Sequence, residues 1–196
     1  MPNNLALFDF DGTITKRDSF IELIKYYKGL TYFYTGLILL SPFLLLYKAK
    51  IIKNWWTKEL VFTYFFKNEP YKVFKNNCRK FSLNVIPELI KPPALEALKN
   101  HINKGDRIII ITASFEDVLA DWCESMHLEL LGTKISIKEG LITGKIDGKN
   151  CYGIEKVIRL NQYIDISQFS EIYAYGDSKG DIPMLEIANH SFYRLF

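Results

Sequence analysis

The 196-residue sequence lacks the features that would indicate a metal finger, a disulfide framework or a nucleic-acid surface. Cys78, Cys123 and Cys151 are odd in number, lie far apart and form no CxxC pair, which predicts reduced thiols. Runs of lysine and arginine are absent, and acids and bases are mixed at a net charge of +3, so we expect no nucleic acid as partner. The opening MPNNLALFDFDG lacks the charged and apolar regions of a secretory signal, so we expect a cytoplasmic protein.

Charge is missing altogether from residues 29–47, which read GLTYFYTGLILLSPFLLLY between two lysines. This length is close to the ~18–20 apolar residues of a membrane-spanning helix, although Pro42 and two glycines interrupt the run. Three interpretations stay open: the core of a helical unit, a surface lying on a bilayer, and a span, which is the least favoured. Trp55 and Trp56 with nearby lysines suit an interfacial anchor, so peripheral contact with the inner face of the membrane through residues 29–56 is one expectation.

Outside residues 18–90, strands and helices alternate along the chain. Short apolar or β-branched runs predict strands at 5–9, 107–112 and 171–176, and residues 133–146 read as a hairpin. Helical patterns lie between them. This order predicts an α/β fold with a parallel sheet covered by helices on both faces. Residues 18–90 read as helical and aromatic throughout, which indicates a helical insert after the first strand.

Acidic and hydroxyl side chains gather where the predicted strands end. In such sheets, ligands bind beyond the carboxyl ends of the strands. The residues at these ends are Asp9 and Asp11 in DFDGT, Thr112 and Ala113 in ITAS, Asp177 and Asp181 in GDSKGD, and Lys156 at the start of a helix.

These residue types suit phosphoryl transfer. Clustered carboxylates repel one another unless a hard dication such as Mg²⁺ lies between them. A lysine and a strand-end hydroxyl can bind phosphate oxygens. Asp9, ionised at neutral pH, can attack phosphorus to give an aspartyl-phosphate, and Asp11 lies on the same side of the extended backbone, where it can move protons.

The constellation resembles the haloacid dehalogenase superfamily of phosphatases. DFDGT (9–13) matches the first motif, DxDxT, and ITAS (111–114) matches the second. Lys156 matches the third motif, and GDSKGD (176–181) matches the fourth, GDxxxD. The resemblance implies a Rossmann-like catalytic core of residues 1–16 and 91–196, with a helical C1-type cap at residues 17–90.

The resemblance also implies a role for each matching residue. Asp9 would be the nucleophile and Asp11 the acid/base. Mg²⁺ would be held by Asp9, the main-chain carbonyl of Asp11, and Asp177, with Asp181 in support. Thr112, Ala113 and Lys156 would bind the phosphate.

A helical insert after the first motif is similar to the cap of subfamily IB, the branch that includes phosphoserine phosphatases. In that branch an acidic residue nine positions after the nucleophile helps select the substrate. Here this is Asp18, which is equally well explained as a helix N-cap.

Three departures argue against phosphoserine as the substrate. Residues 112–115 read Thr-Ala-Ser-Phe where those enzymes usually have Ser-Gly-Gly-Phe, Val157 replaces a glycine after Lys156, and the insert is far more apolar. We expect an apolar or phospholipid phosphate, as in the group that includes phosphatidylglycerophosphate phosphatases. The alternatives are a phosphatase of soluble phosphorylated metabolites and, less favoured, a non-catalytic module that binds Mg²⁺ and phosphate.

Overall fold

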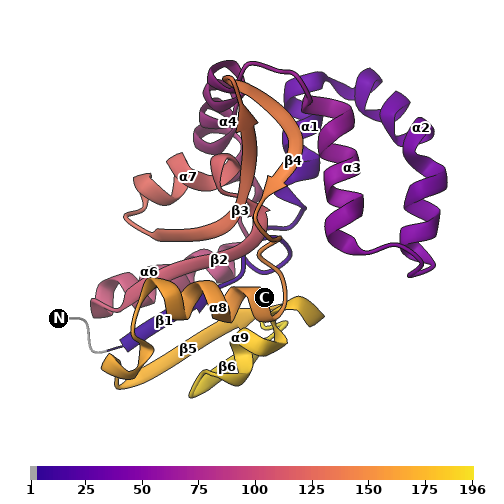
Figure 1. Ribbon diagram of the computed structural model, residues 1–196. Helices are drawn as coiled ribbons and strands as arrows, with labels where there is room; N and C mark the ends of the chain where they lie inside the picture. Colours follow the sequence, from indigo (N-terminus) through magenta and orange to yellow (C-terminus); the bar gives the residue numbers. More distant parts are fainter. Residues whose placement is uncertain (1–3) are drawn as a thin grey trace.

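The computed structural model describes residues 4–196, in which six strands form one sheet in the order β4-β3-β2-β1-β5-β6 (Figure 1). The strands are β1 (Asn4–Phe8), β2 (Arg107–Phe115), β3 (Glu129–Lys138), β4 (Leu141–Asp147), β5 (Glu171–Gly176) and β6 (His190–Tyr193). Only the β3–β4 pair is antiparallel, and the other four pairs are parallel. The predicted α/β class is therefore confirmed.

Helices cover both faces of the sheet because β1 and β2 are apolar on both sides. Leu5 and Leu7 pack with α8 (Ile154–Tyr163) and α9 (Ile182–Glu186). The alternate residues Ala6 and Phe8 belong to a second cluster, which includes α6 (Pro92–Lys104) and α7 (Glu116–Ser125). Successive side chains of a strand point to opposite faces, so this alternation places β1 in the middle of the core.

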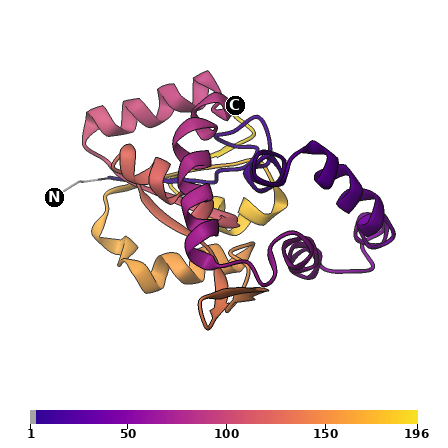
Figure 2. The ribbon, with the colours of Figure 1, turned by 90° about the horizontal axis from the view of Figure 1, so that it is seen from above.

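The inserted segment leaves the sheet after β1 and returns at α6. It contains α1 (Ser19–Lys28), α2 (Leu30–Lys48), α3 (Asn54–Phe66), α4 (Tyr71–Asn84) and the short α5 (Ile86–Leu89). Aromatic side chains fill the space between these helices; Phe62 contacts Phe66, Phe74 and Phe115 of β2, the last with ring centroids 4.5 Å apart. Figures 1 and 2 show α2 at the outer margin of the molecule, away from β1 and β5.

The β3–β4 hairpin joins the insert to the sheet. Thr63 of α3 donates a hydrogen bond to the Gly144 carbonyl at 2.8 Å, and the Asn68 amide donates to the Ile142 carbonyl at 2.8 Å. The sequence pattern predicts this hairpin at 133–146, but β3 begins earlier because its first residues pair with β2. These bonds hold α3 against the core.

The apolar run 29–47 is one continuous helix despite Pro42. Proline removes the amide that would have bonded to the carbonyl of Ile38, and the Ser41 hydroxyl donates to that carbonyl at 2.7 Å instead. Of the 19 residues of α2, only Phe33, Gly36 and Leu40 are buried. By length and composition alone α2 could cross a membrane, and packing within the molecule accounts for only a small part of its apolar surface.

Candidate active site

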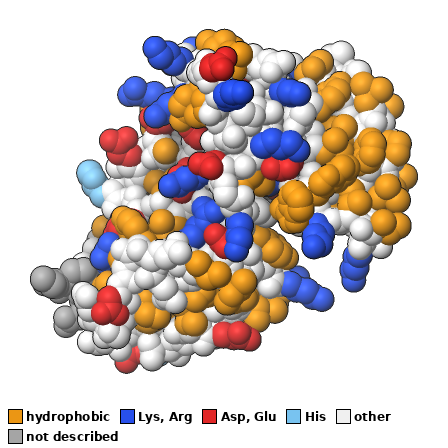
Figure 3. All heavy atoms as spheres, viewed as in Figure 1, with side chains coloured by type: hydrophobic (Ala, Val, Ile, Leu, Met, Phe, Trp, Pro, Cys, Tyr) orange, Lys and Arg blue, Asp and Glu red, His pale blue; other side chains and the backbone are white. Residues whose placement is uncertain are grey.

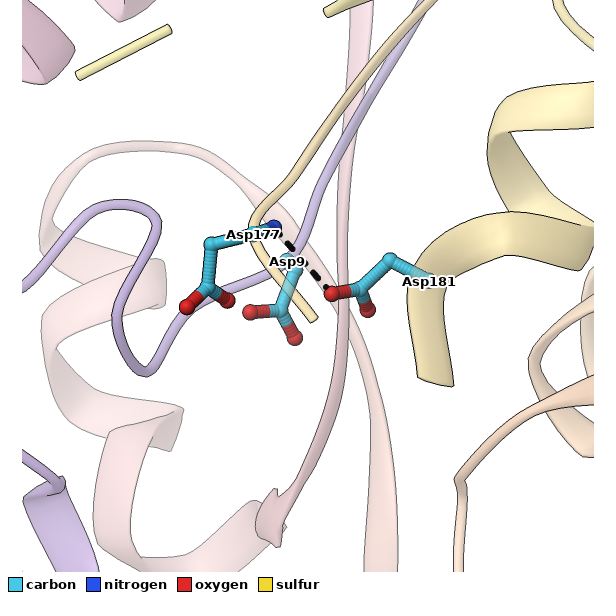
Figure 4. A group of neighbouring side chains, drawn as sticks. All are labelled: Asp9, Asp177 and Asp181. Atoms are coloured by element: carbon cyan, nitrogen blue, oxygen red, sulfur yellow. Dashed lines mark hydrogen bonds between the residues drawn. The ribbon is translucent and has the colours of Figure 1, made fainter. Parts of the chain in front are cut away.

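Three carboxylates meet at the carboxyl edge of the sheet. Asp9 follows β1, Asp177 follows β5, and Asp181 ends a short 3-10 turn at Lys179–Asp181. One carboxylate oxygen from each lies within 4.8 Å of the others, and Figure 4 shows the three side chains converging. The parallel pairing of β1 with β5 brings Asp9 next to two aspartates from the other end of the chain, as the strand-end pattern predicts.

Lys156 lies at the centre of this group. Its Nζ donates to Asp9 Oδ1 and to Asp181 Oδ1, each at 2.6 Å, and the side chain is almost completely buried. Burial alone would lower the pKa of Lys156, but the charges of Asp9 and Asp181 outweigh it and the pKa is raised. The lysine therefore keeps its positive charge at neutral pH.

Asp9 is held at both carboxylate oxygens. Lys156 contacts Oδ1, and the Thr13 hydroxyl donates to Oδ2 at 3.1 Å. Burial raises the pKa of Asp9 to about 6, and the Lys156 charge limits that rise. The carboxylate is thus mostly ionised at neutral pH, the form that a nucleophile needs.

Asp11 has a different environment two residues further on. The Ser19 amide donates to Oδ1 at 2.7 Å and the Ser19 hydroxyl to Oδ2 at 3.1 Å. Burial, with a smaller contribution from the charge of Asp18, raises the pKa of Asp11 to about 8. At neutral pH Asp9 is therefore mostly ionised and Asp11 mostly protonated, so two carboxyl groups two residues apart differ in protonation state.

Both carboxylate oxygens of Asp181 are hydrogen-bonded within the site. Its Oδ2 accepts hydrogen bonds from the Asp177 amide at 3.2 Å, the Ser178 amide at 2.9 Å and the Ser178 hydroxyl at 2.8 Å. Burial would raise the pKa of Asp181, but the Lys156 charge and these hydrogen bonds lower it overall. Both of its carboxylate oxygens therefore already have hydrogen-bond partners.

The remaining oxygens fit a hard divalent cation. Among the described residues, the only donor near the Asp177 carboxylate is the Thr13 hydroxyl at 3.4 Å, whose single hydrogen is shared with Asp9 Oδ2 at 3.1 Å. Burial and the charge of Asp181 raise the pKa of Asp177, which marks a carboxylate short of positive partners. Asp9 Oδ2 and the Asp177 carboxylate are ligands of the type that Mg²⁺ prefers.

A pocket of about 320 Å³ opens onto these residues. Its walls include Asp9, Asp11, Lys156 and the predicted phosphate-binding pair Thr112 and Ala113. The Thr112 hydroxyl accepts a hydrogen bond from the Ser114 amide at 3.0 Å, so its hydrogen is free to point elsewhere. The sequence-predicted residues thus share one cavity, except Asp177, which is not among its walls.

Asp18 lies at the rim of the pocket and caps α1. Its Oδ1 accepts a hydrogen bond from the Ile21 amide at 2.9 Å, the geometry of an N-cap. Because the same side chain also lines the pocket, the structure is compatible with both interpretations of Asp18.

Lys58 is a further site residue, one that the sequence motifs do not include. It comes from α3 of the insert, lines the pocket, and donates to the main-chain carbonyl of Ala113. Burial lowers the pKa of Lys58 to about 8, although the charges of Asp11 and Asp18 act in the opposite direction. The sequence contains one indication of this position. Lys58 lies four residues before Phe62 and eight before Phe66, so helical spacing places it on the side of α3 that carries these buried residues.

Comparison with known proteins assigns the chain to a family. The family model for haloacid dehalogenase-like hydrolases matches residues 6–186. Protein CicA of Caulobacter vibrioides is 33% identical over 98% of this chain and 86% of its own length. A histidinol-phosphatase of Neisseria meningitidis is 24% identical over 95% of this chain and 87% of its own length. A crystal structure of a Bordetella pertussis protein of unknown function superposes with a TM-score of 0.83 at 23% identity, covering 96% of this chain and 88% of that one.

The chain belongs to the haloacid dehalogenase-like hydrolase family. It is an enzyme with phosphatase relatives, and the resemblance inferred from the four motifs is confirmed at the level of the family.

Proposed function

We propose that this protein is a Mg²⁺-dependent phosphomonoester hydrolase that acts through an aspartyl-phosphate on Asp9. The observation that carries the proposal is the environment of Asp9, which is buried, held at 2.6 Å by Lys156, and open to a pocket that also contains Asp11. This arrangement combines an oriented nucleophile with a proton donor two residues away.

The reaction has two steps on these residues. The Asp9 carboxylate forms a bond to phosphorus as the ester P–O bond breaks, and Asp11, protonated because of its raised pKa, gives its proton to the leaving oxygen. A water molecule then attacks phosphorus, Asp11 takes a proton from it, and the Asp9–phosphorus bond breaks to release inorganic phosphate. Asp11 thereby returns to its starting protonation state.

Mg²⁺ bound by Asp9, the Asp11 main-chain carbonyl and Asp177 would neutralise charge on the transferring phosphoryl group. Thr112, the Ala113 amide and Lys156 border the place where the other phosphate oxygens would lie, and they supply donors and positive charge.

The substrate side of the pocket supports an ester with an apolar part. Phe20, Ile21, Leu44, Tyr47 and Val61 of the insert line it. We propose that residues 17–90 act as a cap over a core of residues 1–16 and 91–196, and that an apolar or phospholipid phosphate enters between them, on the cytoplasmic side of a membrane.

A soluble phosphomonoester is the second candidate, because Lys58 favours it. A half-buried ammonium that lines the pocket with Asp11 and Asp18 suits a second anionic group, such as a carboxylate on a small metabolite. In that case Asp18 at the rim would help to select the substrate.

Phosphate release tests the proposal. The purified protein is assayed with Mg²⁺ on phosphatidylglycerophosphate in mixed micelles, on a small aryl phosphate and on a panel of soluble phosphomonoesters. We expect Asp9→Asn to lose at least about a thousandfold in turnover. Asp147→Asn, at an exposed aspartate at the end of β4, serves as the matched control and keeps full turnover.

Acid quenching during turnover should trap phosphate covalently on the wild-type chain and not on Asp9→Asn. Turnover by Asp9→Asn at the wild-type rate, or label bound to another residue, would contradict the proposed nucleophile. Preference for the micellar lipid supports the apolar substrate, and preference for a soluble ester supports the second candidate.

A further inference from the structure

The outer surface of α2 is apolar and open to solvent. Ile38 is 72% exposed and Leu45 is 67% exposed, and they lie seven residues apart on one side of the helix. Tyr34, Leu39 and, beyond the helix, Ile51 are exposed as well. Figure 3 shows hydrophobic side chains gathered over the part of the molecule that carries α2. Soluble surfaces rarely leave so continuous an apolar area uncovered.

The turn next to this surface is positively charged. Lys48 at the end of α2, and Lys50 and Lys53 in the turn before α3, are exposed, whereas Lys25 and Lys28 of α1 form ion pairs with Glu22 and Glu69. Between residues 23 and 58 the chain contains six lysines and neither an aspartate nor a glutamate. Half-exposed Trp55 lies beside this turn at the start of α3, where an aromatic ring suits the boundary between lipid and water. Apolar and aromatic groups bordered by lysines complement a bilayer with anionic headgroups.

The anchoring of both ends of the α1–α3 segment excludes a span. Ser19 at the start of α1 hydrogen-bonds to Asp11, and Thr63 near the end of α3 hydrogen-bonds to Gly144 of β4. Lys58 in between contacts Ala113 at the catalytic pocket. Both neighbours of α2 are therefore held to the same core, on one side of any membrane that α2 contacts.

The exposed helix is also a wall of the catalytic pocket. Leu44 and Tyr47 of α2 line that pocket together with Asp9 and Asp11. A surface held against α2 would therefore lie beside the opening through which a substrate reaches the nucleophile.

We propose that the outer face of α2 and the lysine turn at residues 48–53 dock on the surface of an anionic phospholipid bilayer, with the helix lying in the interface. The docking itself stands on the exposed apolar face and the lysines. It rests on the proposed phosphatase function only for its consequence, the direct entry of a lipid phosphomonoester into the pocket.

Vesicle sedimentation tests docking without any catalytic step. Full-length protein is mixed with vesicles of phosphatidylcholine alone or with about three-tenths phosphatidylglycerol, and the bound fraction is measured. We expect binding to the anionic vesicles, and we expect Ile38→Gln/Leu45→Gln to weaken it at least about tenfold. The control Leu83→Gln/Ile102→Gln, which removes two exposed apolar side chains elsewhere, should bind like wild type.

A second pair of variants isolates the charge. Lys48→Gln/Lys50→Gln/Lys53→Gln should lose the preference for anionic vesicles, and Lys72→Gln/Lys75→Gln/Lys80→Gln, three exposed lysines of α4, should keep it. All four variants should hydrolyse a soluble aryl phosphate like wild type when vesicles are absent. That assay reports on the proposed catalytic function, so its failure is distinguishable from a failure to dock.

Three results of the vesicle experiment overturn the proposal. They are no binding of wild type to anionic vesicles, binding of Ile38→Gln/Leu45→Gln as strong as that of wild type, and an unchanged preference for anionic vesicles in Lys48→Gln/Lys50→Gln/Lys53→Gln. A dimer in solution that Ile38→Gln/Leu45→Gln converts to a monomer would assign the face to a second copy of the chain, and would also overturn it.

Discussion

Gly12 lies directly against the Asp177 carboxylate. A Cβ atom at position 12 would come within 2.5 Å of Asp177 Oδ2, and the backbone there has φ of +85°, which favours glycine. The glycine of DFDGT therefore lets the turn after β1 approach the end of β5 closely. Its absence of a side chain keeps the proposed metal side of the site open.

Gly12→Ala should impair the metal site more than the fold. We expect a loss of about 1–2 kcal/mol in the free energy of unfolding from the positive φ and the displaced Asp177, with turnover reduced at least about tenfold and more Mg²⁺ needed for half-maximal rate. Gly105→Ala is the matched control, because it has φ of +74° and a Cβ atom added there would meet nothing within 4 Å. Equal turnover of the two variants would contradict this prediction.

Lys156→Met should destabilise the protein as well as inactivate it. The substitution leaves Asp9 and Asp181 buried without their shared counter-charge, which typically costs about 3–5 kcal/mol in the free energy of unfolding. The double variant Lys156→Met/Asp181→Asn removes one of the stranded charges and should recover part of that loss. Denaturant unfolding of both variants checks this, and a double variant less stable than the single one would refute it.

KM for an anionic substrate should increase at alkaline pH, where Lys58 loses its charge. Its pKa of about 8 means that the ammonium is charged below that pH and neutral above it. We therefore expect KM for an anionic substrate to rise as the pH increases through 8, because an attractive charge is lost. In Lys58→Arg the guanidinium stays charged and the rise should disappear. An unchanged pH profile of KM in Lys58→Arg would rule out this role.

His101 should support the fold without taking part in catalysis. Its Nδ1 lies 2.7 Å from Asp106 Oδ2 and its Nε2 lies 2.9 Å from the Tyr175 hydroxyl, in a buried position. His101→Phe leaves both partners without this hydrogen bond, so we expect a loss of about 2–3 kcal/mol in the free energy of unfolding with kcat unchanged. Tyr175→Phe, which removes one hydroxyl, should cost about 1 kcal/mol. A fall in kcat for a well-folded His101→Phe would contradict the structural role.

Chelation should stop turnover without unfolding the protein. Lys156 already neutralises part of the acidic group, so the fold has an internal counter-charge when the divalent ion is removed. We expect EDTA to abolish phosphate release, added Mg²⁺ to restore it, and Ca²⁺, a larger ion with looser geometry, to restore little. Circular dichroism melts with and without EDTA check the fold; a chelated sample that is unfolded at room temperature would contradict the prediction.

The strand-end cluster was predictable because parallel pairing fixes where the ends of strands lie. Once LALF, RIIIIT and EIYAYG are recognised as neighbouring strands, Asp9, Thr112 and Asp177 are expected at one edge. The predicted end of the second strand at residue 112 was too early: β2 continues to Phe115 after a register shift that follows Ile111. The short β6 was missed because His190–Tyr193 is an edge strand of four residues with a mostly polar start. Its place depends on backbone pairing with β5 and not on its own pattern.

The contribution of the insert was less predictable. The contact of Lys58 with Ala113 joins residues 55 positions apart from an inserted helix and a strand, and no local pattern encodes it. The exposure of α2 could not be predicted from the sequence either. Its apolar residues lie on all sides of the helix, so no amphipathic period identifies an inner face. The roles of Asp9, Asp11, Asp18 and the phosphate-binding residues stay predictions until the experiments above are done.

The lysine turn at residues 48–53 also affects how the protein approaches a charged surface. Lys25 and Lys28 form ion pairs with Glu22 and Glu69, whereas Lys48, Lys50 and Lys53 are exposed and form no ion pair among the described residues. Positive charge next to α2 is therefore concentrated in this turn. Near a negatively charged surface the field exerts a torque that turns the lysine turn, and α2 with it, toward the surface before any contact is made.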